Sequence, residues 1–197
     1  VDLAVDHAHR GFLHDLALVA LAGEDVELGL ADQVMPLAED AGELIEVIVA
    51  RPFNHIGPGQ SERFALSDFA RQIAAMRHTD AIKKLFVGNI EVTRDFLDAR
   101  DVVRAYDMLF ENSLNANVYN VCSSQEYLLS DLVRRLIKIS GVDIAIEVDA
   151  SRWRPAEQSR MVGSNAKLMD ATGWTPVIHL DETLLQIYEY WEHQLEK

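Results

Sequence analysis

The chain has little sulfur chemistry and little positive charge. Cys122 is the only cysteine in 197 residues, so no disulfide can form within the chain, and a reducing cytoplasm fits. Lys and Arg number 18 against 32 Asp and Glu, a formal net charge of −14, which argues against a nucleic-acid surface because phosphate binding needs clustered cations. No apolar run reaches the length of a membrane span, and the acidic start lacks the basic region of a signal peptide. We therefore expect a cytoplasmic protein whose partners are neither nucleic acid nor membrane.

Several chemical motifs are also absent. A dinucleotide site needs a Gly-rich turn whose backbone N–H groups reach the pyrophosphate, yet neither G-x-G-x-x-G nor G-x-x-G-x-x-G occurs. His7, His9 and His14 lack the spacing of a zinc pattern, so no metal site is expected. Asp95 and Asp98 do not form a glycosidase pair in this interpretation, because Asp98 is better explained as a helix cap.

The most informative stretch present is 51–60, Arg-Pro-Phe-Asn-His-Ile-Gly-Pro-Gly-Gln. The apolar run 44–50, rich in Val and Ile, predicts a buried parallel strand that leads into it. Gly57, Pro58 and Gly59 predict a turn that lets backbone approach a ligand. Asn54 and His55 would lie at the carboxyl end of the strand, where open α/β sheets bind ligands. An ordinary loop, with Asn54 bonding its own backbone, is the alternative.

The remaining pattern alternates helices and strands, which predicts an α/β fold. Asp98, Ser130 and Asp181 are the expected N-caps of three helices, and Gly141 and Gly173 are expected at helix ends. Helices are expected over 64–76, 99–110, 131–140, 164–172 and 181–196, and strands over 85–87, 117–122 and 144–148. Before residue 44, helices are expected over 1–9, 13–22 and 31–41, and a short strand over 25–28.

The chain resembles the extended short-chain dehydrogenase/reductase family over roughly residues 31–197. Within that family it is most similar to the enzymes that make and reduce GDP-4-keto-6-deoxymannose. The resemblance lies in the 51–60 string and in Val87-Gly88-Asn89, Thr93-Arg94-Asp95-Phe96-Leu97-Asp98, Tyr119-Asn120-Val121-Cys122-Ser123, Arg154-Pro155-Ala156-Glu157 and Gly173-Trp174-Thr175-Pro176.

This resemblance implies a Rossmann-like parallel sheet with a small C-terminal α/β substrate-binding lobe. Residues 1–50 would be a remnant of the cofactor domain, and residues 51–197 would hold the remaining strands and the nucleotide-sugar lobe, the two being intertwined. Two explanations of the absent motifs compete. The gene product lacks a cofactor half, or the sequence is a remnant with stretches missing, which is the interpretation we favour.

The resemblance also implies roles for individual residues. Pro52, Phe53 and His55 would contact the cofactor, which is NADP or NAD. Asn54, Arg94, Arg154 and Glu157 would contact the substrate, a GDP-linked sugar. The alternatives are a turn-stabilising Asn54, a His55 packed under the turn and a surface ion pair of Arg94 with Asp95 or Asp98. Gln60 departs from the family's dehydratases, which have Arg near this position, and Arg152 and Arg160 are expected in solvent.

No catalytic residue can be assigned, because the family's Ser and Tyr-x-x-x-Lys precede the RPFN strand and no Ser, Tyr or Lys precedes Ser61. The implied function is NAD(P)-dependent reduction of the 4-keto group of a GDP-linked 6-deoxyhexose. A GDP-mannose 4,6-dehydratase or another nucleotide-sugar epimerase or dehydratase is the alternative, and a non-catalytic nucleotide-sugar-binding protein is the second. The family commonly forms homodimers through two helices per subunit, one of which would end near Ala41.

Overall fold

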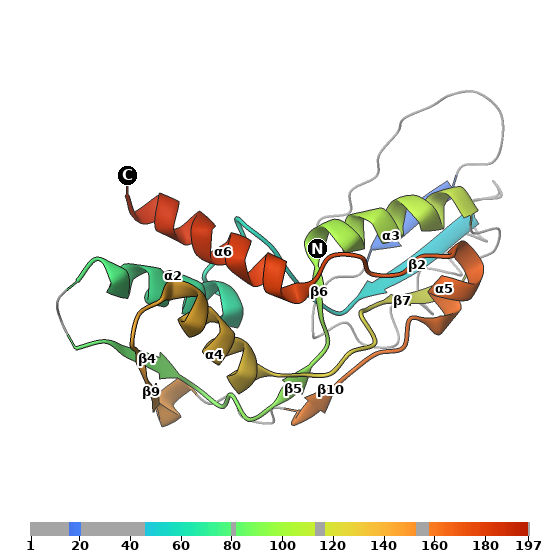
Figure 1. The fold of residues 1–197 in the computed structure, drawn as a ribbon. Coiled ribbons are helices and arrows are strands. Elements are labelled where there is room, and N and C mark those ends of the chain that lie inside the picture. The colour runs from blue at the N-terminus through green and yellow to red at the C-terminus, as the bar shows by residue number, and fades with distance from the viewer. Residues whose placement is uncertain (1–15, 21–45, 80–81, 113–116, 153–157, 197) are drawn as a thin grey trace.

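The protein consists of two lobes joined by short strands, as the computed structural model shows (Figure 1). The structure describes residues 16–20, 46–79, 82–112, 117–152 and 158–196. In the first lobe three strands form a parallel sheet in the order β1 (Leu16–Ala20), β2 (Glu46–Pro52) and β7 (Val118–Val121). The register pairs Leu16 with Glu46 and Ala50 with Tyr119. This parallel sheet confirms the predicted Rossmann-like fold class.

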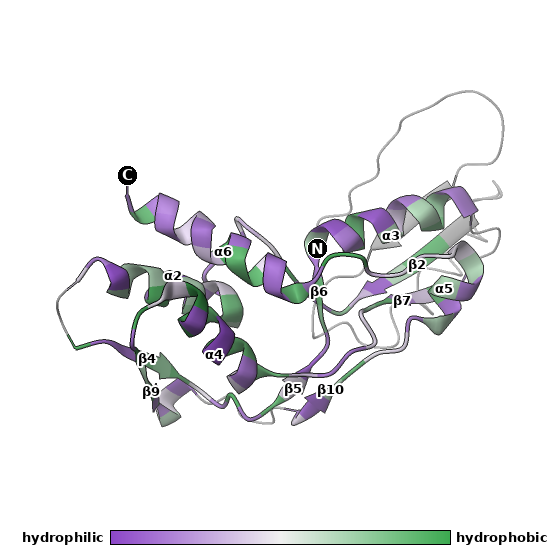
Figure 2. Cartoon of the chain, in the orientation of Figure 1, coloured by the Kyte–Doolittle hydropathy of each residue, from purple (hydrophilic) through white to green (hydrophobic). Residues whose placement is uncertain are grey.

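Two helices, α3 (Ala99–Asn112) and α5 (Ala166–Thr172), pack against this sheet. Residues 48–50 of β2 are fully buried, and hydrophilic residues follow the outer side of α3 (Figure 2). Trp174 has no exposed surface and donates its indole N–H to the Asp101 backbone oxygen. The core of this lobe comprises Ile48, Ala50, Leu97, Val102, Ala105, Leu109, Tyr119, Val121, Leu168 and Trp174.

The second lobe is built from three helices over a two-stranded parallel sheet. The helices α2 (Ala65–Arg77), α4 (Leu129–Ser140) and α6 (Leu180–Leu195) pack on one another, and the strands are β4 (Lys84–Val87) and β9 (Ala145–Val148). Its core is separate from that of the first lobe and includes Phe69, Ile73, Leu85, Leu132 and Leu184. The sequence predicted the ends of each of these helices and strands to within two residues.

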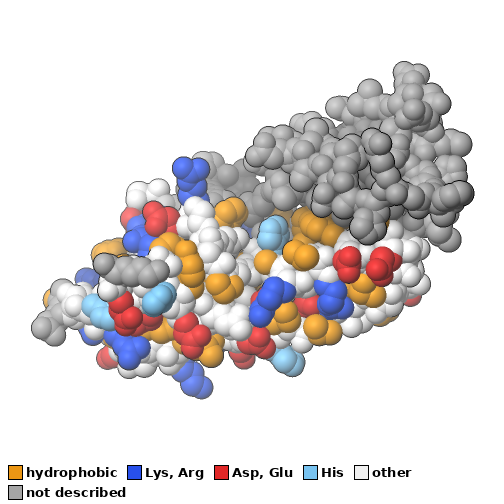
Figure 3. All heavy atoms as spheres, turned by 90° about the horizontal axis from the view of Figure 1, so that it is seen from above, with side chains coloured by type: hydrophobic (Ala, Val, Ile, Leu, Met, Phe, Trp, Pro, Cys, Tyr) orange, Lys and Arg blue, Asp and Glu red, His pale blue; other side chains and the backbone are white. Residues whose placement is uncertain are grey.

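Short strands connect the lobes. β3 (Asn54–Ile56) pairs in parallel with β6 (Phe96–Asp98), while β5 (Thr93–Arg94) lies between β10 (Arg160–Met161) and β8 (Tyr127–Leu128). In Figure 1 these elements occupy the middle of the molecule, and a 3-10 turn (Ala150–Arg152) follows β9. On the face shown in Figure 3, basic and acidic side chains are interspersed. None of the helices in the described ranges is long and apolar enough to cross a membrane.

Several local expectations were wrong. Residues 16–20 form a strand, not part of a helix over 13–22, because a short apolar run fits either element and pairing with β2 decides. Ser130 and Asp181 do not cap helices: α4 starts at Leu129 and α6 at Leu180, so both residues lie inside the first turn. Ser130 is buried and Asp181 pairs with Arg135. The expectations for 1–9, 25–28 and 31–41 fall outside the described residues.

Asp98 fulfils its predicted role as the cap of α3. Its Oδ1 accepts the Arg100 backbone N–H at 2.8 Å, and the Arg100 side chain donates to both carboxylate oxygens. Thr183, on α6, donates to Oδ2 at 2.7 Å. The carboxylate therefore joins the start of α3 to the second lobe. Burial by itself would raise the pKa of Asp98, but the hydrogen bonds from Arg100 and Thr183 outweigh burial and lower it.

Asp98→Asn should therefore destabilise the protein at neutral pH by about 2 kcal/mol, the scale of hydrogen bonds to a charged group. Because the folded pKa lies below the ordinary value of 3.8, this contribution is fully present above about pH 4. It is lost as the pH falls from 3.8 through the folded pKa. Urea unfolding of both proteins at pH 7 and at pH 3 measures the difference. A difference that stays constant between these pH values would contradict the assignment.

Candidate functional site

The segment 51–60 leaves the first sheet and turns between the lobes. β2 ends at Pro52, and the Phe53 backbone N–H then bonds the Val121 oxygen at 2.9 Å. β3 follows directly and pairs Asn54 with Phe96. Gly59 closes the turn with a φ of 83°, a left-handed conformation that favours glycine. The predicted strand and turn are confirmed, and they place Asn54 and His55 just beyond the carboxyl end of β2.

Asn54 and His55 are both tied to backbone oxygens. Asn54 Nδ2 donates to the Asp95 oxygen at 3.2 Å, so this amide bridges two strands instead of bonding its own turn. His55 Nδ1 lies 3.1 Å from the Phe53 oxygen. A carbonyl oxygen can only accept, so the His55 Nδ1 carries the hydrogen of this bond.

Asp95 lies among the short strands that connect the two lobes, and we call it the hub because several segments bond to it. Its carboxylate has no exposed surface and accepts hydrogen bonds from Ser123 N and Oγ at 2.8 and 2.7 Å and from Ser124 N at 2.9 Å. A longer contact of 3.4 Å comes from Gly163 N. Burial raises the pKa of the Asp95 carboxyl, and the hydrogen bonds from Ser123, Gly163 and Ser124 act against that rise. One buried group thus joins β5, the segment after β7 and the segment after β10.

Arg94 lies next to this hub and is only 8% exposed. Its Nη1 donates to the Thr93 oxygen at 2.9 Å. A buried position does not fit the surface ion pair with Asp95 or Asp98 that was the alternative, because those carboxylates are held by Ser123 and by Arg100. A guanidinium presents its N–H donors in a planar fork that suits a carboxylate or a phosphate, so Arg94 stays a candidate for an anion site.

The other two predicted substrate residues, Arg154 and Glu157, lie outside the described residues. The flanking arginines are exposed, as expected: Arg152 is 3.5 Å from Asp68, and Arg160 donates from Nε to Glu126 Oε1 at 3.0 Å and from Nη2 to Oε2 at 2.9 Å. Gly88 controls how closely the 3-10 turn approaches β4, because a Cβ at that position would be 2.8 Å from the Arg152 backbone oxygen. The glycine of the Val-Gly-Asn string is therefore required by packing.

Gly163 was not singled out from the sequence, yet it supports the predicted cofactor residue Phe53. A Cβ there would lie 2.7 Å from the Phe53 ring and 2.7 Å from Cys122 Sγ. Cys122 is fully buried, as expected, and burial raises the pKa of its thiol to about 11. This thiol is an inert packing group. Only the close approach to the ring reveals the role of Gly163, and no sequence spacing predicts it.

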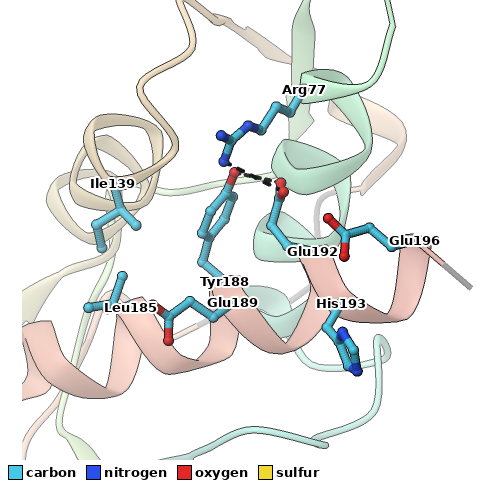
Figure 4. A pocket seen from close by; sticks show the side chains of 8 residues that line it. All are labelled: Arg77, Ile139, Leu185, Tyr188, Glu189, Glu192, His193 and Glu196. Atoms are coloured by element: carbon cyan, nitrogen blue, oxygen red, sulfur yellow. Dashed lines mark hydrogen bonds and ion pairs between the residues drawn. The ribbon is translucent and has the colours of Figure 1, made fainter.

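Two shallow depressions lie elsewhere on the surface. One, of about 360 Å³, is bounded by Arg77 and α6, where the Tyr188 hydroxyl donates to Glu192 at 2.6 Å and Arg77 lies 3.6 Å from the same carboxylate (Figure 4). The other, of about 380 Å³, lies beside Gly88 and Arg134. Burial raises the pKa of Tyr188, and raises that of Tyr106 to about 12, so neither phenol has the lowered pKa of a catalytic Tyr. Within the described ranges, no group of three or more His, Cys, Asp or Glu side chains is placed to hold a metal ion.

A parallel sheet with a glycine turn beyond its carboxyl edge, joined to a small α/β lobe, is the architecture of a Rossmann-like protein of the extended short-chain dehydrogenase/reductase type. Residues 35–187 match the GDP-mannose 4,6 dehydratase family. The chain belongs to that family.

Individual relatives agree with this assignment. The chain is 46% identical over 149 residues to a GDP-6-deoxy-D-mannose reductase of Pseudomonas aeruginosa, covering 76% of this chain and 49% of the reductase. It is 24% identical over 132 residues to GDP-mannose 4,6 dehydratase 2 of Arabidopsis thaliana, covering 66% of this chain and 35% of that protein. The chain therefore spans half or less of the length of these relatives.

Solved structures show the same fold. The structure of RMD from Pseudomonas aeruginosa complexed with NADPH superposes with a TM-score of 0.77 at 42% identity, over 85% of this chain and 54% of that one. A putative epimerase from Burkholderia cenocepacia gives a TM-score of 0.75 at 29% identity, over 91% of this chain and 64% of that one.

Asp95→Asn tests the hub. The new amide would turn N–H donors toward the N–H groups of Ser124 and Gly163, leaving buried donors without an acceptor. Because each orphaned group costs roughly 1–3 kcal/mol, unfolding in urea should show a loss of about 3 kcal/mol at pH 7. Asp170→Asn, an exposed aspartate on α5, is the control and should change stability little. A loss no larger than that of the control would show that Asp95 is not the hub.

Proposed function

We propose that this chain belongs to an NADP-dependent reductase that acts on the 4-keto group of a GDP-linked 6-deoxyhexose. The observation that carries the proposal is the bond from Asn54 to the Asp95 oxygen. It ties the segment that holds the proposed cofactor residues Pro52, Phe53 and His55 to Asp95, the chain neighbour of Arg94, which is proposed for the substrate. The 46% identity to a GDP-6-deoxy-D-mannose reductase supports the choice of reaction.

On the cofactor side, Pro52, Phe53 and His55 would contact the nicotinamide end. The Phe53 ring packs against Gly163 and its backbone N–H bonds the Val121 oxygen, while His55 Nδ1 bonds the Phe53 oxygen. The positions of both side chains are therefore fixed before a cofactor binds. These residues fit one end of a dinucleotide, which supplies hydride when bound. The structure of the Pseudomonas relative contains NADPH and supports NADP, whereas an epimerase from Thermus thermophilus contains NAD.

On the substrate side, Asn54, Arg94, Arg154 and Glu157 would bind the GDP-sugar. Arg94 can pair with a diphosphate through parallel N–H donors, which an acidic protein needs because the ligand is itself an anion. Asn54 can offer a donor and an acceptor to a sugar hydroxyl. Arg154 would join Arg94 at the diphosphate, and Glu157 would accept hydrogen bonds from ribose or sugar hydroxyls.

The organisation of the whole protein follows the same proposal. Residues 1–50 would belong to the cofactor domain, to which β1 and β2 contribute, and residues 51–197 would supply the remaining strands and the nucleotide-sugar lobe. The resemblance supports a cytoplasmic homodimer. A dehydratase is the second candidate, because the family match bears that name, and Gln60, where dehydratases of the family have Arg, favours the reductase.

Arg94→Lys should weaken GDP binding about tenfold or more, because a lysine keeps the charge but loses the paired donors and the packing of the guanidinium. Isothermal titration of the natural gene product with GDP measures the change. Arg160→Lys is a matched control: Arg160 pairs with Thr93 in the adjacent strand but its side chain is exposed and holds Glu126. Equal affinities for the Arg94 and Arg160 variants would remove Arg94 from the site.

The isolated 197-residue chain should not oxidise NADPH with GDP-4-keto-6-deoxymannose. It contains no Gly-rich loop for the pyrophosphate and no Tyr-x-x-x-Lys to deliver a proton, a step worth roughly 10²–10⁴-fold. A natural gene product that contains both motifs should turn over, as loss of absorbance at the reduced-nicotinamide band shows. Turnover by the 197-residue chain would contradict this account. A gene product that binds GDP-sugar but has no activity would favour the binding-protein alternative.

A further inference from the structure

A series of hydrogen bonds runs from the C-terminal helix to the turn at 53–60. Ser67, in the first turn of α2, has no exposed surface. Its hydroxyl donates to the Gln60 backbone oxygen at 2.7 Å and accepts the Trp191 indole N–H, from α6, at 3.1 Å. The hydroxyl thus uses its donor and an acceptor site at once, and links α6 to the end of the turn.

Gln60 continues the series toward His55. Its backbone N–H bonds the Gly57 oxygen at 3.3 Å, and its side-chain Nε2 donates to the His55 oxygen at 2.9 Å. His55 in turn has its ring nitrogen at the Phe53 oxygen. The path from Trp191 to His55 therefore consists of consecutive bonds through Ser67 and Gln60.

Two features set this path apart from ordinary helix packing. Ser67 lies in the first turn of α2, where no preceding helical turn offers a carbonyl, and its hydroxyl instead bonds an oxygen seven residues back along the chain. The Gln60 carboxamide also keeps its NH2 on His55 while its Oε1 is buried and, among the residues described, has no hydrogen-bond partner. A buried acceptor without a partner costs free energy, and the Gln60 side chain nevertheless keeps its Nε2 bonded to the His55 oxygen.

We propose that Trp191, Ser67 and Gln60 are positioning residues that let α6 set the place of the 53–60 turn, and hence of the cofactor end of the site. This inference rests on the proposed function in assigning the cofactor to Pro52, Phe53 and His55. The substrate residue Arg94 lies on β5 and takes no part in the path. Breaking the path should therefore affect the dinucleotide and spare GDP.

The test uses Ser67→Ala, Trp191→Phe and the double variant in the natural gene product. Ser67→Ala removes both bonds of the hydroxyl and Trp191→Phe removes one of them, so in each variant the Kd for NADPH should rise about three- to tenfold, while the Kd for GDP stays unchanged. The double variant should be no worse than about the larger single effect, because both changes break the same path. Without ligand, the backbone N–H of Gln60 should exchange its hydrogen with solvent about three- to tenfold faster in each variant than in the unaltered protein.

Two controls separate positioning from general destabilisation. Ser130→Ala removes another fully buried helix hydroxyl, on α4, and Tyr188→Phe removes a hydroxyl from α6 that bonds Glu192. Neither should change the NADPH affinity or the exchange at Gln60. Unchanged Gln60 exchange in the Ser67 and Trp191 variants would overturn the path whatever the protein binds.

Faster exchange with an unchanged Kd for NADPH would overturn the positioning role. Equal weakening of NADPH and GDP would do the same, because it would indicate a loss of general structure. If the unaltered gene product binds no NADPH, the proposed function fails, and faster exchange at Gln60 in both variants would still support control of the turn by α6.

Discussion

A carboxylate with no exposed surface is stable only if hydrogen-bond donors surround it, and Asp95 is surrounded by donors from two separate parts of the chain. Ser123 and Ser124 follow β7, and Gly163 follows β10. Ser124 adopts a φ of 59°, which is unfavourable for a non-glycine residue, while its N–H bonds Asp95. The two lobes have separate cores, and this buried charge holds the strands that cross between them.

The candidate site depends on the same crossing. The backbone of Asp95 accepts the Asn54 amide, and its sequence neighbour Arg94 is buried beside it. Gly163, which donates to the carboxylate, also packs against the Phe53 ring. Groups proposed for the cofactor and groups proposed for the sugar nucleotide therefore share one anchor, although they come from distant parts of the sequence.

Sequence patterns predicted the elements whose information is local. The apolar run that ends at Pro52, the glycines at 141 and 173 and the cap at Asp98 each act within a few residues, and the structure confirms them. Residues 16–20 were assigned wrongly because a five-residue apolar run fits a helix or a strand until its partner strand is known.

The long-range contacts were beyond the reach of such patterns. From the sequence, Asp95 was weighed only as an ion-pair partner of Arg94 or as a pair with Asp98. The groups that donate hydrogen bonds to it lie 28 and 68 residues away, so no local pattern reveals them. Gly163 stood in a polar loop without a turn motif, and the bond from Trp191 to Ser67 spans 124 residues. The resemblance to a known family supplied candidate residues, but only the fold shows that Asn54 bonds the backbone of Asp95, the residue next to Arg94 in the chain.

The most direct test of the account is a crystal structure of the natural gene product with NADPH and GDP bound. The account predicts the nicotinamide in contact with Pro52, Phe53 or His55 and the diphosphate within hydrogen-bond distance of the Arg94 guanidinium. Asp95 should remain bonded to Ser123 and Ser124 beneath both ligands. Binding of GDP in the depression beside Tyr188, or a diphosphate held away from Arg94, would contradict it.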